Sequence, residues 1–258
     1  MSQVLRLTSK LTTTQKKFFA ELIGTFIVVV LASGSVVLDA KLGKTLGIPF
    51  IAFAPFVGVA ISVYLFGKVS MAHFNPAVTI GYLITKHLPK NLLPCYIGAE
   101  IIGALLGSIF VKYVIGTEAN LGANVPNYDF PLLVIFGTEV LASGLLMGVI
   151  YAVVYTKGLR GFSGIAIGGI VGLDIYFFAF ISGASMNPAR SLAPALLSGS
   201  LGDLWLYWSA TFVGTALVAS MLRKKRSHNK IAPGDIIQVS NDFYVVQEVG
   251  ASKIQVND

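Results

Sequence analysis

The chain has 258 residues, of which 55% are hydrophobic and only 12% are charged, a composition too apolar for a soluble domain of this length. The formal net charge of +7 is spread over short segments between apolar runs, a distribution that argues against a nucleic-acid partner. The single cysteine, Cys95, excludes an internal disulfide framework.

Six apolar segments are each long enough to cross a lipid bilayer, which takes about 20 residues as a helix. In chain order they cover residues 17–38, 48–67, 92–115, 131–157, 163–182 and 203–222. A β-barrel would instead show short strands of alternating apolar and polar residues. Because these runs are continuous and rich in Gly, Ala, Ile, Leu and Val, the sequence predicts an all-α membrane protein.

Basic residues alternate along the chain. They precede the first span, lie between the second and third and between the fourth and fifth, and follow the sixth, whereas residues 116–130 contain no Lys or Arg. Lys41 and Lys44 in the first outer loop are minor exceptions. Cytoplasmic loops carry an excess of Lys and Arg, so the pattern predicts a multi-pass topology with both termini cytoplasmic. We expect the protein in the cell (plasma) membrane.

The two halves of the chain, about 17–115 and 131–222, repeat one pattern. Glu21 lies in the first span and Glu139 in the fourth, and each half continues with a span, a short Asn-Pro-Ala segment and a further span. Three spans per half give the second half the opposite orientation. Inverted repeats of this kind place their working site near the midplane, at the interface of the repeats.

The Asn-Pro-Ala segments predict two short helices. The tripeptide occurs first as Asn75, Pro76 and Ala77 and again as Asn187, Pro188 and Ala189. Asparagine is a favoured N-cap, and proline is favoured at the first helical position. The resulting helices, about 75–86 and 187–197, have roughly a dozen residues each and reach only about half-way through the hydrocarbon. We expect two re-entrant half-helices that meet N-terminus to N-terminus.

Two helix N-termini at the membrane centre raise an electrostatic barrier to cations, including protons. The side-chain amides of Asn75 and Asn187 can meanwhile donate hydrogen bonds to a neutral oxygen. The pattern therefore predicts a narrow pore that passes neutral hydroxylic molecules and rejects ions. The alternative, that Asn-Pro only marks a loop turn, is disfavoured by its recurrence at matching places of an inverted repeat.

The segments AHFNPAVT (72–79) and SMNPARS (185–191), with the glutamate-containing first and fourth spans, resemble the aquaporin (major intrinsic protein) family over residues 17–222. The resemblance implies six spans plus two half-helices, an hourglass pore in each subunit, a homotetramer and passive conduction. Ser191, Ala195 and the pair Tyr207–Trp208 resemble the water-channel type rather than glycerol facilitators. Water is thus the implied permeant, with glycerol and other small neutral solutes as further candidates.

The resemblance also implies a selectivity filter. It assigns Arg190, Ile175 and Ala184 to three filter positions, and Ile175 stands where narrow water channels typically have histidine. A wider and less polar filter, similar to that of archaeal-type members, is expected. The second-span position aligns without gaps on Pro55, where the family commonly has an aromatic residue, so we expect the neighbouring Phe56 to line the pore.

Four acidic residues, Glu21, Glu100, Glu139 and Asp174, fall within predicted spans, where such residues are commonly functional. By resemblance, Glu21 and Glu139 hold the re-entrant loops through hydrogen bonds, and the alternative is a proton relay in a coupled transporter. Glu100 departs from the glutamine common in the family. Asp174 either faces the pore or is buried and hydrogen-bonded, and we favour the buried alternative.

Two histidines lie near the first half-helix. His73 is expected to line the cytoplasmic vestibule and to order the loop, whereas His87 is either a pH-sensitive gate or, as we favour, a solvated loop residue. No second His or Cys stands near His73, so no metal site is expected. The sequence also shows no nucleophile–base pair and no phosphate-binding loop, so neither an enzyme nor a bound cofactor is expected.

Flanking segments complete the predicted organisation. Residues 1–16 form a cytoplasmic N-terminal segment, 17–222 the channel domain and 223–258 a cytoplasmic tail, whose alternating runs predict a small β-hairpin. Three functions remain open: a passive water channel, a facilitator for glycerol or other small neutral solutes, and a proton-coupled secondary transporter. Solute flux comparable to water flux would favour the second, and flux that depends on a pH gradient the third.

Overall fold

The structure is a computed structural model that describes residues 11–228 and two short strands, 236–239 and 242–245. Six helices in this part of the chain are long and apolar enough to cross a membrane, which confirms the predicted fold class. They are α2 (Thr13–Lys41), α3 (Gly47–Ser70), α5 (Leu93–Phe110), α7 (Leu132–Tyr155), α8 (Ser163–Ser182) and α10 (Leu204–His228). The 3-10 helix η1 (Lys90–Leu92) and the π-helix η2 (Val111–Ile115) extend α5 at its two ends, and the 3-10 helix η3 (Arg160–Phe162) precedes α8.

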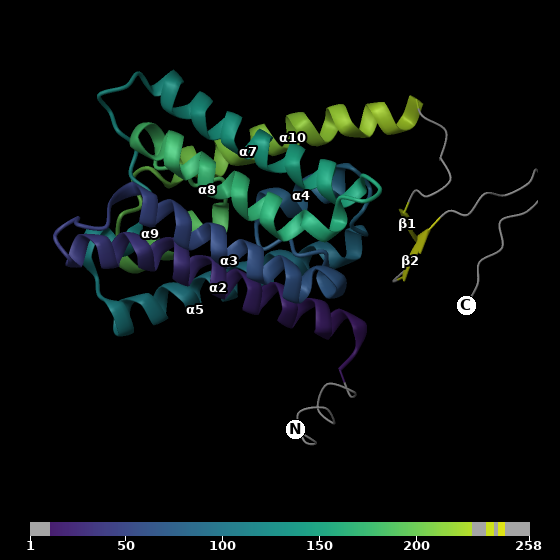
Figure 1. The fold of residues 1–258 in the computed structure, drawn as a ribbon, viewed down its shortest axis with the longest axis horizontal. Coiled ribbons are helices and arrows are strands. Elements are labelled where there is room, and N and C mark those ends of the chain that lie inside the picture. The colour runs from purple at the N-terminus through teal and green to yellow at the C-terminus, as the bar shows by residue number, and fades with distance from the viewer. Residues whose placement is uncertain (1–10, 229–235, 240–241, 246–258) are drawn as a thin grey trace, which may run out of the picture.

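Two short helices complete the bundle: α4 (Pro76–Ile84) and α9 (Pro188–Ser198). Each begins as its sequence predicts, with an extended asparagine as N-cap and proline at the first position. Their nine and eleven residues give lengths of about 14 and 17 Å, well short of a membrane crossing. The two helices lie toward opposite ends of the bundle (Figure 1).

The helices pack as two similar halves. Within the first half α2 contacts α3 and α5, within the second α7 contacts α8 and α10, and α3 packs along α8 between the halves. Close crossings depend on matching glycines: a Cβ on Gly103 would lie 2.3 Å from the Leu22 carbonyl oxygen, and one on Gly214 would lie 2.1 Å from that of Val140. Small residues of this kind let membrane helices approach closely.

Helix α2 begins at Thr13, earlier than the apolar pattern indicates. Thr12 and Gln15 form a reciprocal capping box, in which the Gln15 N–H donates to Thr12 Oγ1 (3.2 Å) and the Thr12 N–H to Gln15 Oε1 (2.9 Å). Part of the predicted N-terminal segment 1–16 is therefore helical, and its first ten residues lie outside the described part.

The start of α2 and the end of α10 lie at the same end of the bundle (Figure 1). After α10, β1 (Ile236–Val239) pairs antiparallel with β2 (Asp242–Val245), with Ile236 opposite Val245. Residues 229–235, 240–241 and 246–258, which complete the predicted tail, lie outside the described residues.

Candidate functional site

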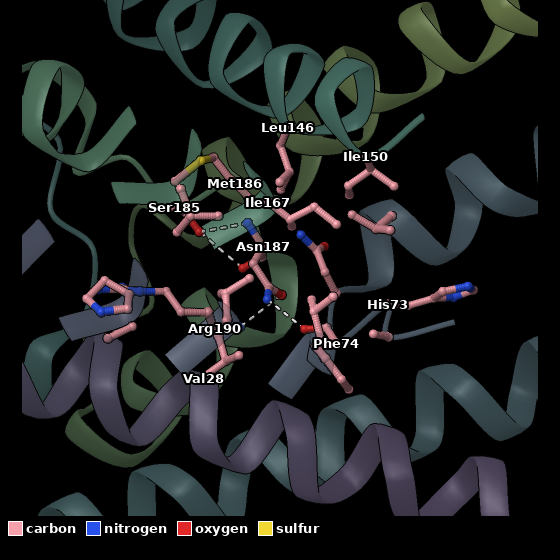
Figure 2. Close-up of a pocket in the computed structure, with 18 of the residues that line it drawn as sticks. Val28, His73, Phe74, Leu146, Ile150, Ile167, Ser185, Met186, Asn187 and Arg190 are labelled. Carbon is pink, nitrogen blue, oxygen red and sulfur yellow. Dashed lines mark hydrogen bonds between the residues drawn. The ribbon is translucent and has the colours of Figure 1, made fainter. Parts of the chain in front are cut away.

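The loops that precede α4 and α9 meet at the interface of the two halves. Asn75 Nδ2 donates to the Met186 carbonyl at 2.8 Å. Asn187 Nδ2 donates to the Phe74 carbonyl, also at 2.8 Å (Figure 2). The Oδ1 of each asparagine accepts from the first turn of its own helix. An amide has two N–H groups, so each asparagine keeps one donor beyond this contact.

Both asparagines line a narrow cavity of about 50 Å³ between the halves. A single water needs roughly 10–15 Å³ in this measure, so the cavity has room for a few waters. His73 lies on one side of Asn187 and Arg190 on the other, so the two residues lie toward different ends of the cavity (Figure 2). The wall is otherwise mainly aliphatic, with Val28, Val59, Val63, Leu146, Ile150, Ile167 and Val171.

A second, larger cavity of about 280 Å³ adjoins the first at its Arg190 end. Four residues line both cavities and therefore mark the passage between them: Ala32, Ile175, Ala184 and Arg190. Three of these are the residues that the resemblance assigns to the filter. The fourth, Ala32 of α2, was missed because nothing in its local sequence distinguishes it from other small residues in an apolar run.

Phe56 is not among the residues that line either cavity. Pro55 lines the narrow cavity instead, and Phe56 packs against α8, where a Cβ on Gly172 would lie 3.1 Å from its Cβ. Helical geometry explains this correction, because successive residues are about 100° apart around the axis. Val59 and Val63, one and two turns after Pro55, share its face.

Buried glutamates hold the two loops in matching ways. Glu21 accepts from the N–H groups of His73 (3.0 Å) and Phe74 (2.6 Å). Glu139 accepts from the N–H groups of Ser185 (2.9 Å) and Met186 (3.1 Å). These hydrogen bonds satisfy irregular backbone that lies outside the helices, as a membrane-embedded loop requires.

Two tyrosines, missed as functional residues by the sequence reasoning, fix the start of the same loops. Tyr96 Oη donates to the Ser70 carbonyl at 2.7 Å, and Tyr207 Oη donates to the Ser182 carbonyl at the same distance. The sequence carried one signal for this role: each tyrosine follows the serine whose carbonyl it binds at a similar spacing, 26 and 25 residues. In the sequence, Tyr207 indicated only the type of channel.

Arg190 is held by Asn124, a residue of the long connection between the halves that sequence reasoning also missed. Arg190 Nη1 donates to Asn124 Oδ1, which also accepts from Ser191 Oγ (3.2 Å). Asn124 Nδ2 donates to the Gly183 carbonyl at 2.8 Å. One amide thus fixes the guanidinium, the first turn of α9 and the loop before it.

The connection reaches this place through the short helix α6 (Glu118–Gly122), which includes three successive left-handed residues, Ala119, Asn120 and Leu121. Left-handed backbone costs roughly 1–2 kcal/mol per non-glycine residue. Burial of Leu121 against Val37 and Val111 offsets part of that cost. Farther along, Tyr128 Oη donates to the Asp203 carboxylate, and this hydrogen bond raises the pKa of Tyr128.

His73 lines the narrow cavity and belongs to a buried hydrogen-bond chain. Its Nδ1 lies 2.8 Å from Thr79 Oγ1, which donates to Glu100 Oε1 at 2.5 Å. The imidazole also stacks on Tyr82 with ring centroids 4.3 Å apart. Glu100, which departs from the family pattern, is thereby connected to the loop through the first turn of α4.

The expectation of a solvated His87 is wrong. The residue is only 5% exposed, its Nδ1 lies 2.8 Å from Thr85 Oγ1, and its ring centroid lies 4.2 Å from that of Tyr155. Asp174 is buried and lines neither cavity, which agrees with one part of the favoured alternative, whereas the hydrogen bonding that it included is not seen at Oδ2 among the described residues. Within that part of the chain, no cluster of three metal-ligating side chains occurs.

Comparison with known proteins places this geometry in a family. Residues 8–222 match the model of the family described as "Major intrinsic protein". Aquaporin NIP3-1 of Arabidopsis thaliana is 37% identical over 88% of this chain and 73% of its own length, and Nodulin-26 of Glycine max is 33% identical over 77% and 73%. These relatives are plant proteins, which corrects the expected likeness to archaeal-type members.

A solved structure, the aquaglyceroporin from Plasmodium falciparum, superposes with a TM-score of 0.70 at 23% identity, covering 82% of this chain and 96% of that one. At this identity the likeness concerns the fold. The family match and the curated relatives carry the assignment, and the chain belongs to the major intrinsic protein (aquaporin) family.

Proposed function

We propose that this multi-pass membrane protein is a passive channel for water that excludes protons and ions, with glycerol or other small neutral solutes as additional permeants. The observation that carries the proposal is the junction of α4 and α9. There Asn75 and Asn187 each contact the opposite loop and line one cavity. Conduction through a fixed pore needs no reaction, and members of this family are channels rather than enzymes.

Permeation follows from the donors and acceptors of that cavity. A water in it can accept a hydrogen bond from the remaining N–H of either asparagine, which replaces part of its hydration at small cost. The N-termini of α4 and α9 each carry roughly half a positive charge toward the same place. A proton or metal cation meets their combined repulsion there, and a second barrier at the guanidinium of Arg190.

We assign the filter to Arg190, Ile175, Ala184 and Ala32, which line both cavities. Arg190 supplies the charged donors, while the other three side chains are apolar and two of them are alanines. Such a passage accepts molecules that have hydroxyl groups on one side and hydrocarbon on the other. This composition favours a second candidate function, facilitation of glycerol or similar solutes, the class to which the name of the Plasmodium falciparum aquaglyceroporin refers.

The assembly and orientation belong to the proposal as well. The family resemblance supports a homotetramer in the lipid bilayer, with one pore in each subunit. The basic loops support cytoplasmic termini, and the plasma membrane is the location that we propose. The start of α2 and the end of α10 at one end of the bundle fit termini on a single side (Figure 1).

Stopped-flow light scattering on proteoliposomes tests the proposal, with water efflux and glycerol uptake measured on the same preparation. We expect water flux far above that of empty liposomes. The matched control is Ala32→Trp, which fills the passage between the cavities and is expected to abolish both fluxes at equal protein content. Wild-type flux no higher than that of empty liposomes, or full flux in the tryptophan variant, would contradict the proposed pore.

A further inference from the structure

Helix α3 passes the filter with a proline on the channel side. Ile51 lines only the outer cavity and Pro55 only the narrow one, whereas the filter residues line both. The helical turn between residues 51 and 55 therefore runs alongside the passage. Pro55 lies inside α3, where the helix continues for fifteen residues to its end at Ser70.

A proline in this position changes the backbone hydrogen bonds of the turn. It has no N–H, so the Ile51 carbonyl loses the donor that an α-helix would supply four residues later. The N–H groups of neighbouring residues in a continuous α-helix are directed to their own carbonyls. Among the described residues, no side chain and no loop N–H donates to the Ile51 oxygen.

The position of the Pro55 ring assigns the freed oxygen to the channel side of the helix. The proline ring adjoins the carbonyl four residues before it, and the steric conflict between them turns that carbonyl away from the helix axis. Because the ring of Pro55 lines the cavity, this space is the channel. Ile51 is half-buried, and an acceptor at membrane depth that has no protein partner requires a hydrogen from a mobile molecule.

We infer that the Ile51 carbonyl oxygen is a hydrogen-bond acceptor of the filter and binds a hydroxyl hydrogen of the permeant. This inference rests on the proposed channel function and specifies its filter. Arg190 can only donate, and the side chains of Ile175 and Ala184 neither donate nor accept. The carbonyl supplies the acceptor that these side chains lack, so a water or polyol donates to Ile51 while accepting from Arg190.

Two residues at position 55 that differ in one backbone group provide the test. Pro55→Ala restores the N–H and so occupies the Ile51 oxygen. Lactic acid at position 55, introduced by nonsense suppression in oocytes, has the same methyl side chain but an ester oxygen in place of the N–H. Both widen the passage equally, so a comparison of the two variants isolates the acceptor.

We expect the glycerol and water permeabilities of Pro55→Ala each to be about five-fold lower than those of the lactic acid variant, the factor that one net hydrogen bond gives. Equal permeabilities in the two variants, or higher ones in Pro55→Ala, would overturn the inference while leaving the channel function intact. A wild-type protein that conducts neither water nor glycerol would instead contradict the channel function.

A second measurement needs no variant. In a high-resolution experimental structure of the wild-type channel, an ordered water should lie about 2.7–3.2 Å from the Ile51 oxygen. The carbonyl of Ala52, whose donor Phe56 has an N–H, serves as the internal reference and should have no such water. Absence of ordered density at Ile51 would overturn the inference even if the two variants failed to reach the membrane.

Discussion

The amide of Asn187 donates across the interface of the two halves to the Phe74 carbonyl, 2.8 Å away and 113 residues apart in sequence. The converse contact joins Asn75 to Met186. Each asparagine thus starts its own half-helix and fixes the other loop, so neither half can form the junction alone. The two helix N-termini are held together by the same groups that offer hydrogen bonds to the permeant.

Replacing Asn187 by aspartate tests the electrostatic role of this junction. Asn187→Asp keeps the cap on α9 but loses the donor to Phe74 and places a negative charge between the two helix N-termini. We expect a proton or cation leak that the wild type lacks, read with a pH-sensitive dye in proteoliposomes. Asn187→Ser, a neutral N-cap, is the control, and an equal leak in both variants would assign the effect to disrupted packing.

Glu139→Gln tests the support of the second loop. The carboxylate accepts from two backbone N–H groups and from Ser182 Oγ, whereas an amide has one acceptor oxygen and would present N–H to N–H. We expect a loss of about 1–3 kcal/mol in stability, measured by thermal unfolding in detergent. The residual water flux should not depend on a pH gradient. A gradient-dependent flux abolished in this variant would favour the proton-coupled transporter instead.

Asn124→Ala tests the support of the filter arginine. The substitution removes the acceptor for Arg190 and Ser191 and the donor to Gly183. Hydrogen bonds to charged groups contribute about 1.5–3 kcal/mol to stability, so the midpoint of thermal unfolding should fall. The glycerol and water permeabilities should change in the same direction. Asn120→Gly is the control, because Asn120 also lines the outer cavity without a hydrogen bond to Arg190, and glycine suits its left-handed backbone. Identical behaviour of the two variants would contradict this role of Asn124.

Ile175→His tests the width of the filter. A histidine adds a donor and reduces the apolar wall between the cavities, so glycerol uptake should fall about ten-fold while water flux is largely retained, a difference of about 1.4 kcal/mol in barrier height. Tyr176→His, on the exposed side of the same helix, is the control. Unchanged glycerol uptake in Ile175→His would mean that the limiting constriction lies elsewhere.

The features that local chemistry determines could be predicted from the sequence. The spans follow from composition, and the half-helices from asparagine and proline at their first positions. Ala32 and Asn124 could not be predicted, because their roles arise where distant segments approach: Asn124 meets Arg190 across 66 residues. His87 was misjudged because Tyr155, from another helix, covers it. The error at Phe56 came from the choice of an aromatic residue over the helical register that places Pro55 on the channel face.

Water conduction without proton leak is best tested by measuring both fluxes simultaneously in proteoliposomes of the wild-type channel. An osmotic step and a pH step are applied to one preparation, with light scattering and an internal pH dye as readouts. We predict rapid water efflux while the internal pH changes no faster than in empty liposomes. Proton flux that rises together with water flux would contradict a proton barrier at the junction of the two helix N-termini, Asn75 and Asn187.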